Sequence, residues 1–188
     1  FLAVDYRGYG NSGGTPSASS MMLDARAIFQ YVQQWLTSEN RSGALFVMGR
    51  SLGSASALEI AYSFEKEISG LILESAFAQT LPLLLALDVD IQKLGISEMD
   101  GFKNVQKIEL ITKPVFILHA QRDTLLPLVN AEILHSKCAA RSKELSIVPG
   151  ADHNTIINVA GDLYFAVLKQ FTNKILKVRT HKPRSKTK

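Results

Sequence analysis

The sequence is poor in cysteine, in tryptophan and in long apolar runs. It holds one cysteine, Cys138, and one tryptophan among 188 residues. A single cysteine excludes an intrachain disulfide and fits a reducing compartment, which favours a cytoplasmic location. The helical spacing around Cys138 indicates a small buried side chain rather than a nucleophile. The apolar run near the middle, Leu81 to Leu87, is far too short to cross a bilayer.

The sequence also lacks an initiator Met and any polar arm before its first apolar segment, since it begins Phe1-Leu-Ala-Val-Asp5. We therefore expect it to be part of a longer protein, with any N-terminal targeting segment upstream of Phe1. Hydrophobic residues make up 46% of the chain and charged residues 20%, which is typical of a globular protein. The length suits one domain with a sizeable core.

Acidic residues are missing from one end of the chain, and this explains the net charge of +4. Residues 177–188 hold six Lys or Arg and no acid, which leaves 15 basic against 17 acidic residues elsewhere. We expect residues 177–188 to form a basic, disordered tail. Contact with an anionic membrane surface is a second possibility. The tail has no aromatic residue on which a base could stack, so we expect no nucleic-acid partner.

Alternating apolar and amphipathic segments predict an α/β fold with a mostly parallel sheet and helices on both faces. The helix before the second strand shows the periodicity well: its apolar residues recur every three or four positions, and Ser19 or Ser20 can cap it. The expected strands are 1–5, 44–48, 70–74, 114–119 and 145–148. The expected helices are about 20–38, 54–64, 128–138 and 156–176.

Residues 75–113 are harder to interpret. Pro82, Gly95 and Gly101 divide them into short helices or loops, and we treat the segment as a short cap or insertion in a domain of residues 1–176. Its apolar stretch, Leu83 to Leu87, either packs in the core or cap or lines an acyl-chain pocket.

The most informative stretch is Gly49-Arg-Ser51-Leu-Gly53, which lies between an apolar run and an Ala/Ser-rich segment. A strand, a tight turn and a helix in this order place a serine at the tip of a strained turn. We expect both Gly49 and Gly53 to be needed because a Cβ at either position would collide as the helix and strand approach. The helix N-terminus would point amides and its positive dipole end at the Ser51 hydroxyl. The pattern alone is weak, since a plain Gly/Ser turn could have the same sequence.

Functional groups in parallel sheets gather beyond the carboxyl ends of the strands. Besides Ser51, this rule selects Glu74, Asp123, Asp152 and His153. His153 lies in a loop and has the freedom to reach a neighbouring strand end. Asp152 is its neighbour in sequence, and consecutive side chains seldom face each other. Asp123 is therefore the better partner for His153, with Glu74 as the second candidate.

The remaining histidine near a strand end is His119, which belongs to its own strand. We expect it to bond to the backbone there. A metal site built from His119, Asp123 and His153 is an alternative that we rank below this one. Glu74, if it is not the acid, is expected to cap or solvate the end of its strand.

The order Ser51, Asp123, His153 resembles that of the α/β-hydrolase family. Three further segments resemble its signature loops: Asp5 to Ser17, His119 to Pro127 and Gly150 to His153. The resemblance covers Phe1 to about Leu176. It implies a single-domain serine hydrolase, in which Ser51 is the nucleophile, His153 the general base and later acid, and Asp123 the group that orients the imidazole.

The same resemblance implies that the backbone N–H of Leu52 is one oxyanion donor and that Arg7 and Asp5 tie the glycine-rich loop together. It implies no metal and no organic cofactor. The expected activity is hydrolysis of an ester, thioester or amide on a small-molecule or lipid-like acyl substrate, through an acyl-enzyme. The alternatives are a non-catalytic binding module and a peptidase of the same fold.

The chain departs from the family pattern at its start. The family's third strand and the loop that supplies the second oxyanion donor should precede Phe1. That strand would lie between the first two strands expected here, so we expect a sheet that lacks its first strands, among them a central one. Because losing one oxyanion donor costs about a hundredfold or more in rate, we expect residues 1–188 alone to be inactive.

Overall fold

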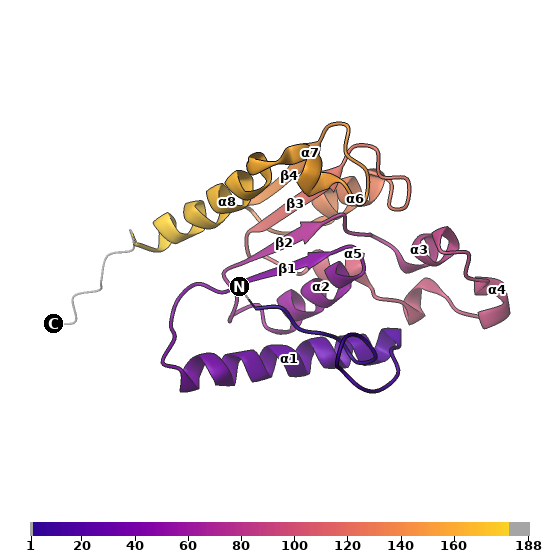
Figure 1. Cartoon of the computed structure of the whole chain (residues 1–188), viewed down its shortest axis with the longest axis horizontal. Helices are drawn as coiled ribbons and strands as arrows, with labels where there is room; N and C mark the ends of the chain where they lie inside the picture. Colours follow the sequence, from indigo (N-terminus) through magenta and orange to yellow (C-terminus); the bar gives the residue numbers. More distant parts are fainter. Residues whose placement is uncertain (1, 181–188) are drawn as a thin grey trace.

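Four parallel strands form the centre of the fold. A computed structural model describes residues 2–180. The sheet order is β1 (Phe46–Arg50), β2 (Gly70–Glu74), β3 (Val115–Ala120) and β4 (Lys143–Val148). All three pairs are parallel, and the carboxyl ends of the strands therefore lie at one edge (Figure 1). The strands fall on four of the five predicted strands, at 44–48, 70–74, 114–119 and 145–148, and the predicted fold class is confirmed.

Helices cover both faces of the sheet (Figure 1). On one face α2 (Gly53–Ser63) and α6 (Val129–Lys137) pack against the strands, α5 (Asn104–Ile108) packs against α2 and α6, and α1 (Ala18–Ser38) packs against α2. On the other face lie α7 (Ile156–Ala160) and α8 (Asp162–Thr180). The strand residues alternate between the two faces. Leu71, Leu73 and Ile117 belong to the first core, and Ile72, Phe116 and Leu118 to the second. Two covered faces explain why these strands read as unbroken apolar runs.

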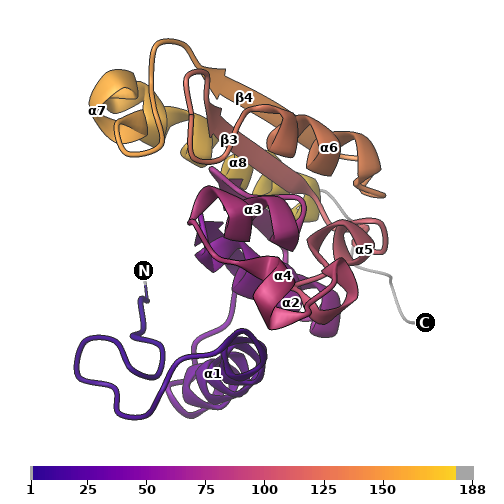
Figure 2. The same ribbon diagram turned by 90° about the vertical axis from the view of Figure 1, so that its right-hand side faces the viewer.

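The strand predicted at residues 1–5 is wrong for its described part. Residues 2–5 have no regular structure, and Leu2 and Val4 are 48% and 46% exposed. In Figure 2 the N-terminal segment lies apart from the sheet, on the side of α1. A strand is stable only when its backbone is paired, and β1 forms the sheet edge nearest this segment without bonding to it. Phe1 lies outside the described residues.

The N-terminus of α1 also differs from its prediction. The cap is Ser17, not Ser19 or Ser20. The Ser17 hydroxyl accepts the Ser20 amide at 3.1 Å, and the Ser20 hydroxyl lies 2.9 Å from the Ser17 amide. This reciprocal pair is a capping box in which serine takes the place of the usual Glu or Gln at the third helical position.

Residues 75–113 form short helices, as the breaks in the sequence predict: α3 (Thr80–Ala86), α4 (Ile91–Leu94), the 3-10 helix η1 (Glu98–Asp100) and α5. The Glu98 carboxylate accepts the Thr80 and Leu81 amides at 2.7 and 2.8 Å and so caps α3 from a distance in sequence. In the apolar stretch Leu83 is buried, whereas Leu85 and Leu87 are more than half exposed. That this segment is a cap or insertion remains a prediction.

The predicted terminal helix is two helices, α7 and α8, which meet at Gly161 with φ +54°. Of the predicted tail, residues 177–180 continue α8 and are helical, contrary to expectation, and residues 181–188 lie outside the described part. Within residues 2–180 no helix has the length and the apolar character that crossing a bilayer requires. Cys138 is buried, as predicted.

The turn between β1 and α2 gives a test of packing. A Cβ on Gly49 would lie 2.3 Å from the Gly53 carbonyl oxygen and 2.7 Å from the Ala57 Cβ, whereas a Cβ on Gly53 would meet no atom within 4 Å. The steric need for glycine predicted at both positions therefore holds only at Gly49. We expect Gly49→Ala to lower the free energy of unfolding by about 1–3 kcal/mol or more. Gly53→Ala should be neutral or slightly stabilising because alanine favours helix.

Urea unfolding of the two variants against the wild type measures this difference. Equal losses in both variants would contradict the assignment of the close approach to Gly49.

Candidate active site

Ser51 lies directly after β1, in a conformation that non-glycine residues seldom adopt. Its φ is +50°, in the left-handed region. Its amide still donates to the Glu74 carbonyl at 2.9 Å, so the ladder between β1 and β2 continues one residue beyond the strand. No side chain caps the N-terminus of α2, which begins two residues later. The amides of Ser54 and Ala55 already donate to the Ser51 and Leu52 carbonyls at 2.9 and 3.1 Å. The amide of Leu52, next to Ser51, is therefore the candidate donor to a negatively charged oxygen.

Asp123, His153 and Ser51 form one chain of hydrogen bonds. His153 Nδ1 lies 2.7 Å from Asp123 Oδ2, and His153 Nε2 lies 3.0 Å from the Ser51 hydroxyl. A carboxylate accepts, so Nδ1 carries the proton, and Nε2 is then free to accept from the hydroxyl. Asp123 and His153 are 5% and 9% exposed. The three residues that the sequence selected therefore meet with the alignment of a nucleophile, a base and an orienting acid.

The Asp123 carboxylate is fixed by its own loop. Its Oδ1 accepts the amides of Leu125 and Leu126 at 3.1 and 2.8 Å. These bonds leave Oδ2 pointing at the imidazole of His153. A buried carboxylate needs such donors because its charge is otherwise costly to remove from water.

The other two candidate acids lie elsewhere. Glu74 is 2% exposed, and its oxygens bind the Arg50 guanidinium at 3.1 Å and the Tyr164 hydroxyl at 2.6 Å, not the imidazole. The sequence predicts that Glu74 caps or solvates its strand end, and its burial contradicts the second of these roles. Asp152 is exposed and accepts from the Asn154 amide. That hydrogen bond is the main cause that lowers the pKa of Asp152.

His119 bonds to the backbone, as the sequence predicts. Its Nε2 donates to the Leu126 carbonyl at 2.8 Å, and its side chain is fully buried. Its Nδ1 has no partner. Burial is the main cause that lowers the pKa of His119, so the ring is neutral at pH 7. Within residues 2–180 no three acidic, His or Cys side chains converge with the geometry of a metal site.

Arg50 and Tyr164 are neighbours of the site that the sequence reading missed. Besides Glu74, the Arg50 guanidinium contacts the carbonyl oxygen of His153 and lies 3.2 Å from Asn154 Oδ1. Arg50 could have been selected as a neighbour of the site from the sequence, because it directly precedes Ser51. Tyr164 carried a weaker signal, since a tyrosine on the buried face of a helix needs a partner for its hydroxyl.

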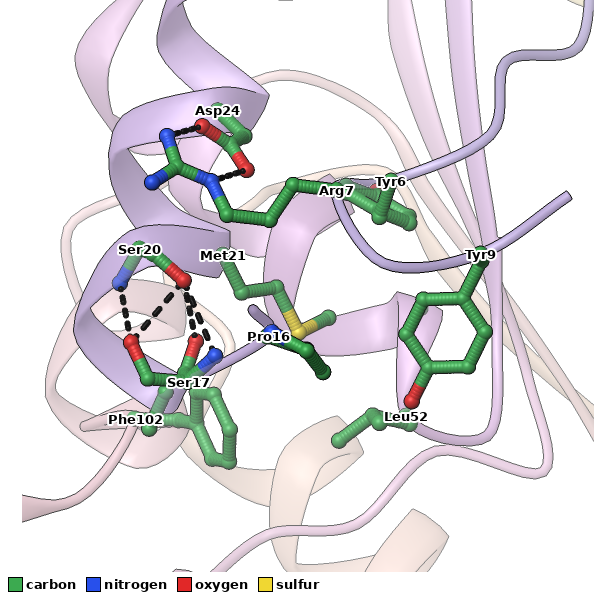
Figure 3. A pocket seen from close by; sticks show the side chains of 12 residues that line it. Tyr6, Arg7, Tyr9, Pro16, Ser17, Ser20, Met21, Asp24, Leu52 and Phe102 are labelled. Carbon is green, nitrogen blue, oxygen red and sulfur yellow. Dashed lines mark hydrogen bonds and ion pairs between the residues drawn. The ribbon is translucent and has the colours of Figure 1, made fainter. Parts of the chain in front are cut away.

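A cavity of about 460 Å³ opens beside Leu52 (Figure 3). Its lining comes from the N-terminal loop, the start of α1, the turn after Ser51 and the segment before α5. Most of the lining side chains are apolar or aromatic. They include Tyr6, Tyr9, Pro16, Met21, Leu52 and Phe102.

The glycine-rich loop at one side of this cavity is tied to α1. Two guanidinium nitrogens of Arg7, Nε and Nη2, donate to the Asp24 carboxylate, and Nε lies 2.7 Å from Oδ2 (Figure 3). The Gly8 amide donates within the loop, to the Ser12 and Gly13 carbonyls at 3.1 Å. Glycines at 8, 10 and 13 have the Gly-x-Gly-x-x-Gly spacing of dinucleotide-binding loops. Here the Gly8 amide is used inside the loop, and residues 2–7 form no strand.

Comparison with known proteins identifies the family. The family described as "Serine aminopeptidase, S33" matches residues 1–99, more than half of the chain. The human "Alpha/beta hydrolase domain-containing protein 17B" is 30% identical over 179 residues, which are 93% of this chain and 57% of that protein. The chain belongs to the α/β-hydrolase superfamily.

Solved structures share the α/β-hydrolase fold. The esterase Pf2001 of Pyrococcus furiosus matches with a TM-score of 0.72 at 21% identity, over 90% of this chain and 68% of that one. A monoacylglycerol lipase of Paleococcus ferrophilus matches with a TM-score of 0.67 at 18% identity, over 90% of this chain and 81% of that one. The chain spans less than three fifths of the length of the curated relatives it matches.

The buried neutral ring of His119 makes stability depend on pH. Its pKa in the folded chain is below the value of about 6.5 that an unfolded chain has. As the pH falls through about 6.5, the unfolded chain binds a proton that the folded chain does not, and the folded state loses stability, by at most about 1.4 kcal/mol per pH unit. His119→Gln, which keeps a donor for the Leu126 carbonyl, should lose less stability over the same range.

Urea unfolding at about pH 7.5 and about pH 5.5, on either side of the ordinary pKa of histidine, tests this expectation. His135→Gln on α6 is the matched control and should retain the wild-type dependence. The same dependence in His119→Gln as in the wild type would exclude His119 as its source.

Proposed function

We propose that this chain carries the catalytic centre of a serine hydrolase that cleaves a carboxylic ester, a thioester or an amide. The observation that supports it most directly is the hydrogen-bond chain from Asp123 through His153 to Ser51, at 2.7 and 3.0 Å. The residues lie at the carboxyl ends of three strands, and their order along the chain matches that of α/β-hydrolases.

In the proposed mechanism His153 Nε2 removes the proton of the Ser51 hydroxyl as its oxygen attacks the substrate carbonyl. The oxygen that becomes negative in the tetrahedral intermediate is stabilised by the amide of Leu52 at the start of α2. His153 then returns the proton to the leaving group, and the Ser51 acyl-enzyme forms. Water activated by His153 attacks this ester and releases the acid and the free serine.

Asp123 has an indirect part in this cycle. It holds the proton of His153 on Nδ1, so that Nε2 faces Ser51 as an acceptor, and its charge stabilises the imidazolium formed at each step. The amides of Leu125 and Leu126 keep this carboxylate from rotating towards water.

The cavity beside Leu52 favours an acyl substrate. Its position next to the proposed oxyanion donor and its mainly apolar lining suit a hydrocarbon chain on one side of the reacting carbonyl. A small-molecule or lipid-like ester or thioester is therefore the preferred substrate class. Solved structures of lipases and esterases with this fold are consistent with that preference.

An aminopeptidase activity is the second candidate, because the matching family carries that description. The same three side chains would serve, since amide and ester hydrolysis use the same intermediates. Aminoacyl anilides compared with acyl esters and acyl thioesters in one assay separate the two candidates. A non-catalytic binding module would leave Ser51 unreactive towards a fluorophosphonate.

Substitution of the proposed nucleophile gives the primary test. In the full-length protein, Ser51→Ala should abolish turnover of a nitrophenyl ester, and Asp123→Asn should lower kcat by about 10⁴ because the imidazole takes the wrong tautomer. The matched control is Ser54→Ala. Ser54 lies three residues after Ser51, and its buried hydroxyl has no hydrogen-bond partner. Full turnover in Ser51→Ala, or equal losses in Ser51→Ala and Ser54→Ala, would reject the mechanism.

The proposed acyl site can be tested at Tyr9, which lines the cavity and is 55% exposed. Tyr9→Ala should raise KM about fivefold for a medium-chain acyl ester, since it removes apolar contact area, and leave an acetyl ester unchanged. Tyr31→Ala, at a tyrosine that is 67% exposed and is not among the cavity's lining residues, is the control. An identical chain-length profile in Tyr9→Ala and the wild type would place the acyl chain elsewhere.

A further inference from the structure

Arg50, Glu74 and Tyr164 form a polar cluster, here called the Arg50 cluster, that the proposed mechanism does not use. Arg50 is the last residue of β1 and directly precedes Ser51. Glu74 is the last residue of β2 and is its register partner. Tyr164 comes from the first turn of α8, on the face of the sheet opposite α2. Two strand ends and one helix thus supply the three side chains of this cluster.

The buried carboxylate of Glu74 organises this cluster. Its Oε1 accepts from Arg50 Nε at 3.1 Å, and its Oε2 accepts from the Tyr164 hydroxyl at 2.6 Å. Burial and the neighbouring carboxylate raise the pKa of Tyr164, so its hydroxyl stays protonated and remains a donor. With one donor on each oxygen, Glu74 is held in place and in turn fixes the direction of the guanidinium.

The other end of the guanidinium reaches the histidine loop. Arg50 Nη2 donates to the carbonyl oxygen of His153 and lies 3.2 Å from Asn154 Oδ1. The imidazole of His153 is bonded to Asp123 at Nδ1. His153 is therefore held at two points, its ring and its carbonyl, and a single ring contact would leave it free to pivot.

We propose that Arg50 is a positioning residue, which holds the backbone of His153 so that the imidazole stays within hydrogen-bond distance of Ser51. This inference rests on the proposed function. Because residues 50 and 51 are consecutive, one guanidinium links the nucleophile turn to the base loop, and the two cannot drift apart independently. A displacement of about 1 Å in such a pair can cost about a hundredfold in rate.

A purely structural role for Arg50, as the counter-ion of a buried carboxylate, makes a different prediction. Arg50→Lys keeps the positive charge beside Glu74 but has one ammonium group in place of a planar fork, so it cannot hold Glu74 and the His153 carbonyl together. A counter-ion role predicts little change in activity. The positioning role predicts a loss of kcat, by about 10- to 100-fold, with KM nearly unchanged.

The test compares Arg50→Lys with Arg26→Lys in the full-length protein. Arg26 also pairs with a buried carboxylate, that of Glu59, which Lys107 contacts as well at 2.6 Å, and the side chains of Arg50 and Arg26 are 43% and 41% exposed. Two readouts are measured: kcat and KM for a nitrophenyl ester, and the downfield proton NMR signal of His153 Nδ1–H in its bond to Asp123. Thermal midpoints of both variants show how much stability each change costs.

We expect Arg50→Lys to lose kcat and to broaden or lose the His153 signal, and Arg26→Lys to change neither. An Arg50→Lys variant with wild-type kcat and an unchanged signal would overturn the inference, as would equal kcat losses in the two variants. If the wild type has no hydrolase activity, the proposed function fails, and the NMR signal still decides whether Arg50 positions His153.

Discussion

The parallel direction of all four strands is the constraint on which the site depends. Because every strand ends at the same edge, residues separated by about a hundred positions in sequence become neighbours. Ser51 follows β1, Glu74 ends β2, and Asp123 and His153 follow β3 and β4. An antiparallel strand in this sheet would send one of these groups to the opposite edge.

Two buried carboxylates at this edge have different hydrogen-bond partners. Glu74 accepts from a guanidinium and a hydroxyl, one on each oxygen. Asp123 accepts two backbone amides on Oδ1 and keeps Oδ2 for the imidazole of His153. Both arrangements satisfy the requirement that a charge removed from water be compensated by donors. Only the second leaves an oxygen for an imidazole, which in the proposed mechanism gains and loses a proton.

The sequence predicts the fold where a pattern is local. Four apolar runs predict four strands, and the glycines around Ser51 predict the turn, because close packing at Gly49 excludes any side chain. It fails where the outcome depends on partners distant in sequence. Residues 2–5 have the composition of a strand but pair with none of the described strands. The contact of Arg50 with the His153 carbonyl joins residues 103 positions apart, and no spacing rule predicts it.

The residues that directly follow the strands determine where the loops of the site leave the sheet. Ser51 and Ser75 have φ of +50° and +43°, and each donates its amide to the next strand at 2.9 Å before the chain turns away. Gln121, after β3, donates to the Val148 carbonyl at 3.1 Å in the same manner. A left-handed conformation costs on the order of 1–3 kcal/mol at a non-glycine residue, and the added ladder bond offsets part of it. The point at which each loop leaves the sheet is therefore set by the register of the strands. The position of the Ser51 hydroxyl is thus determined by the sheet, whereas that of His153 depends also on its loop, which Arg50 contacts.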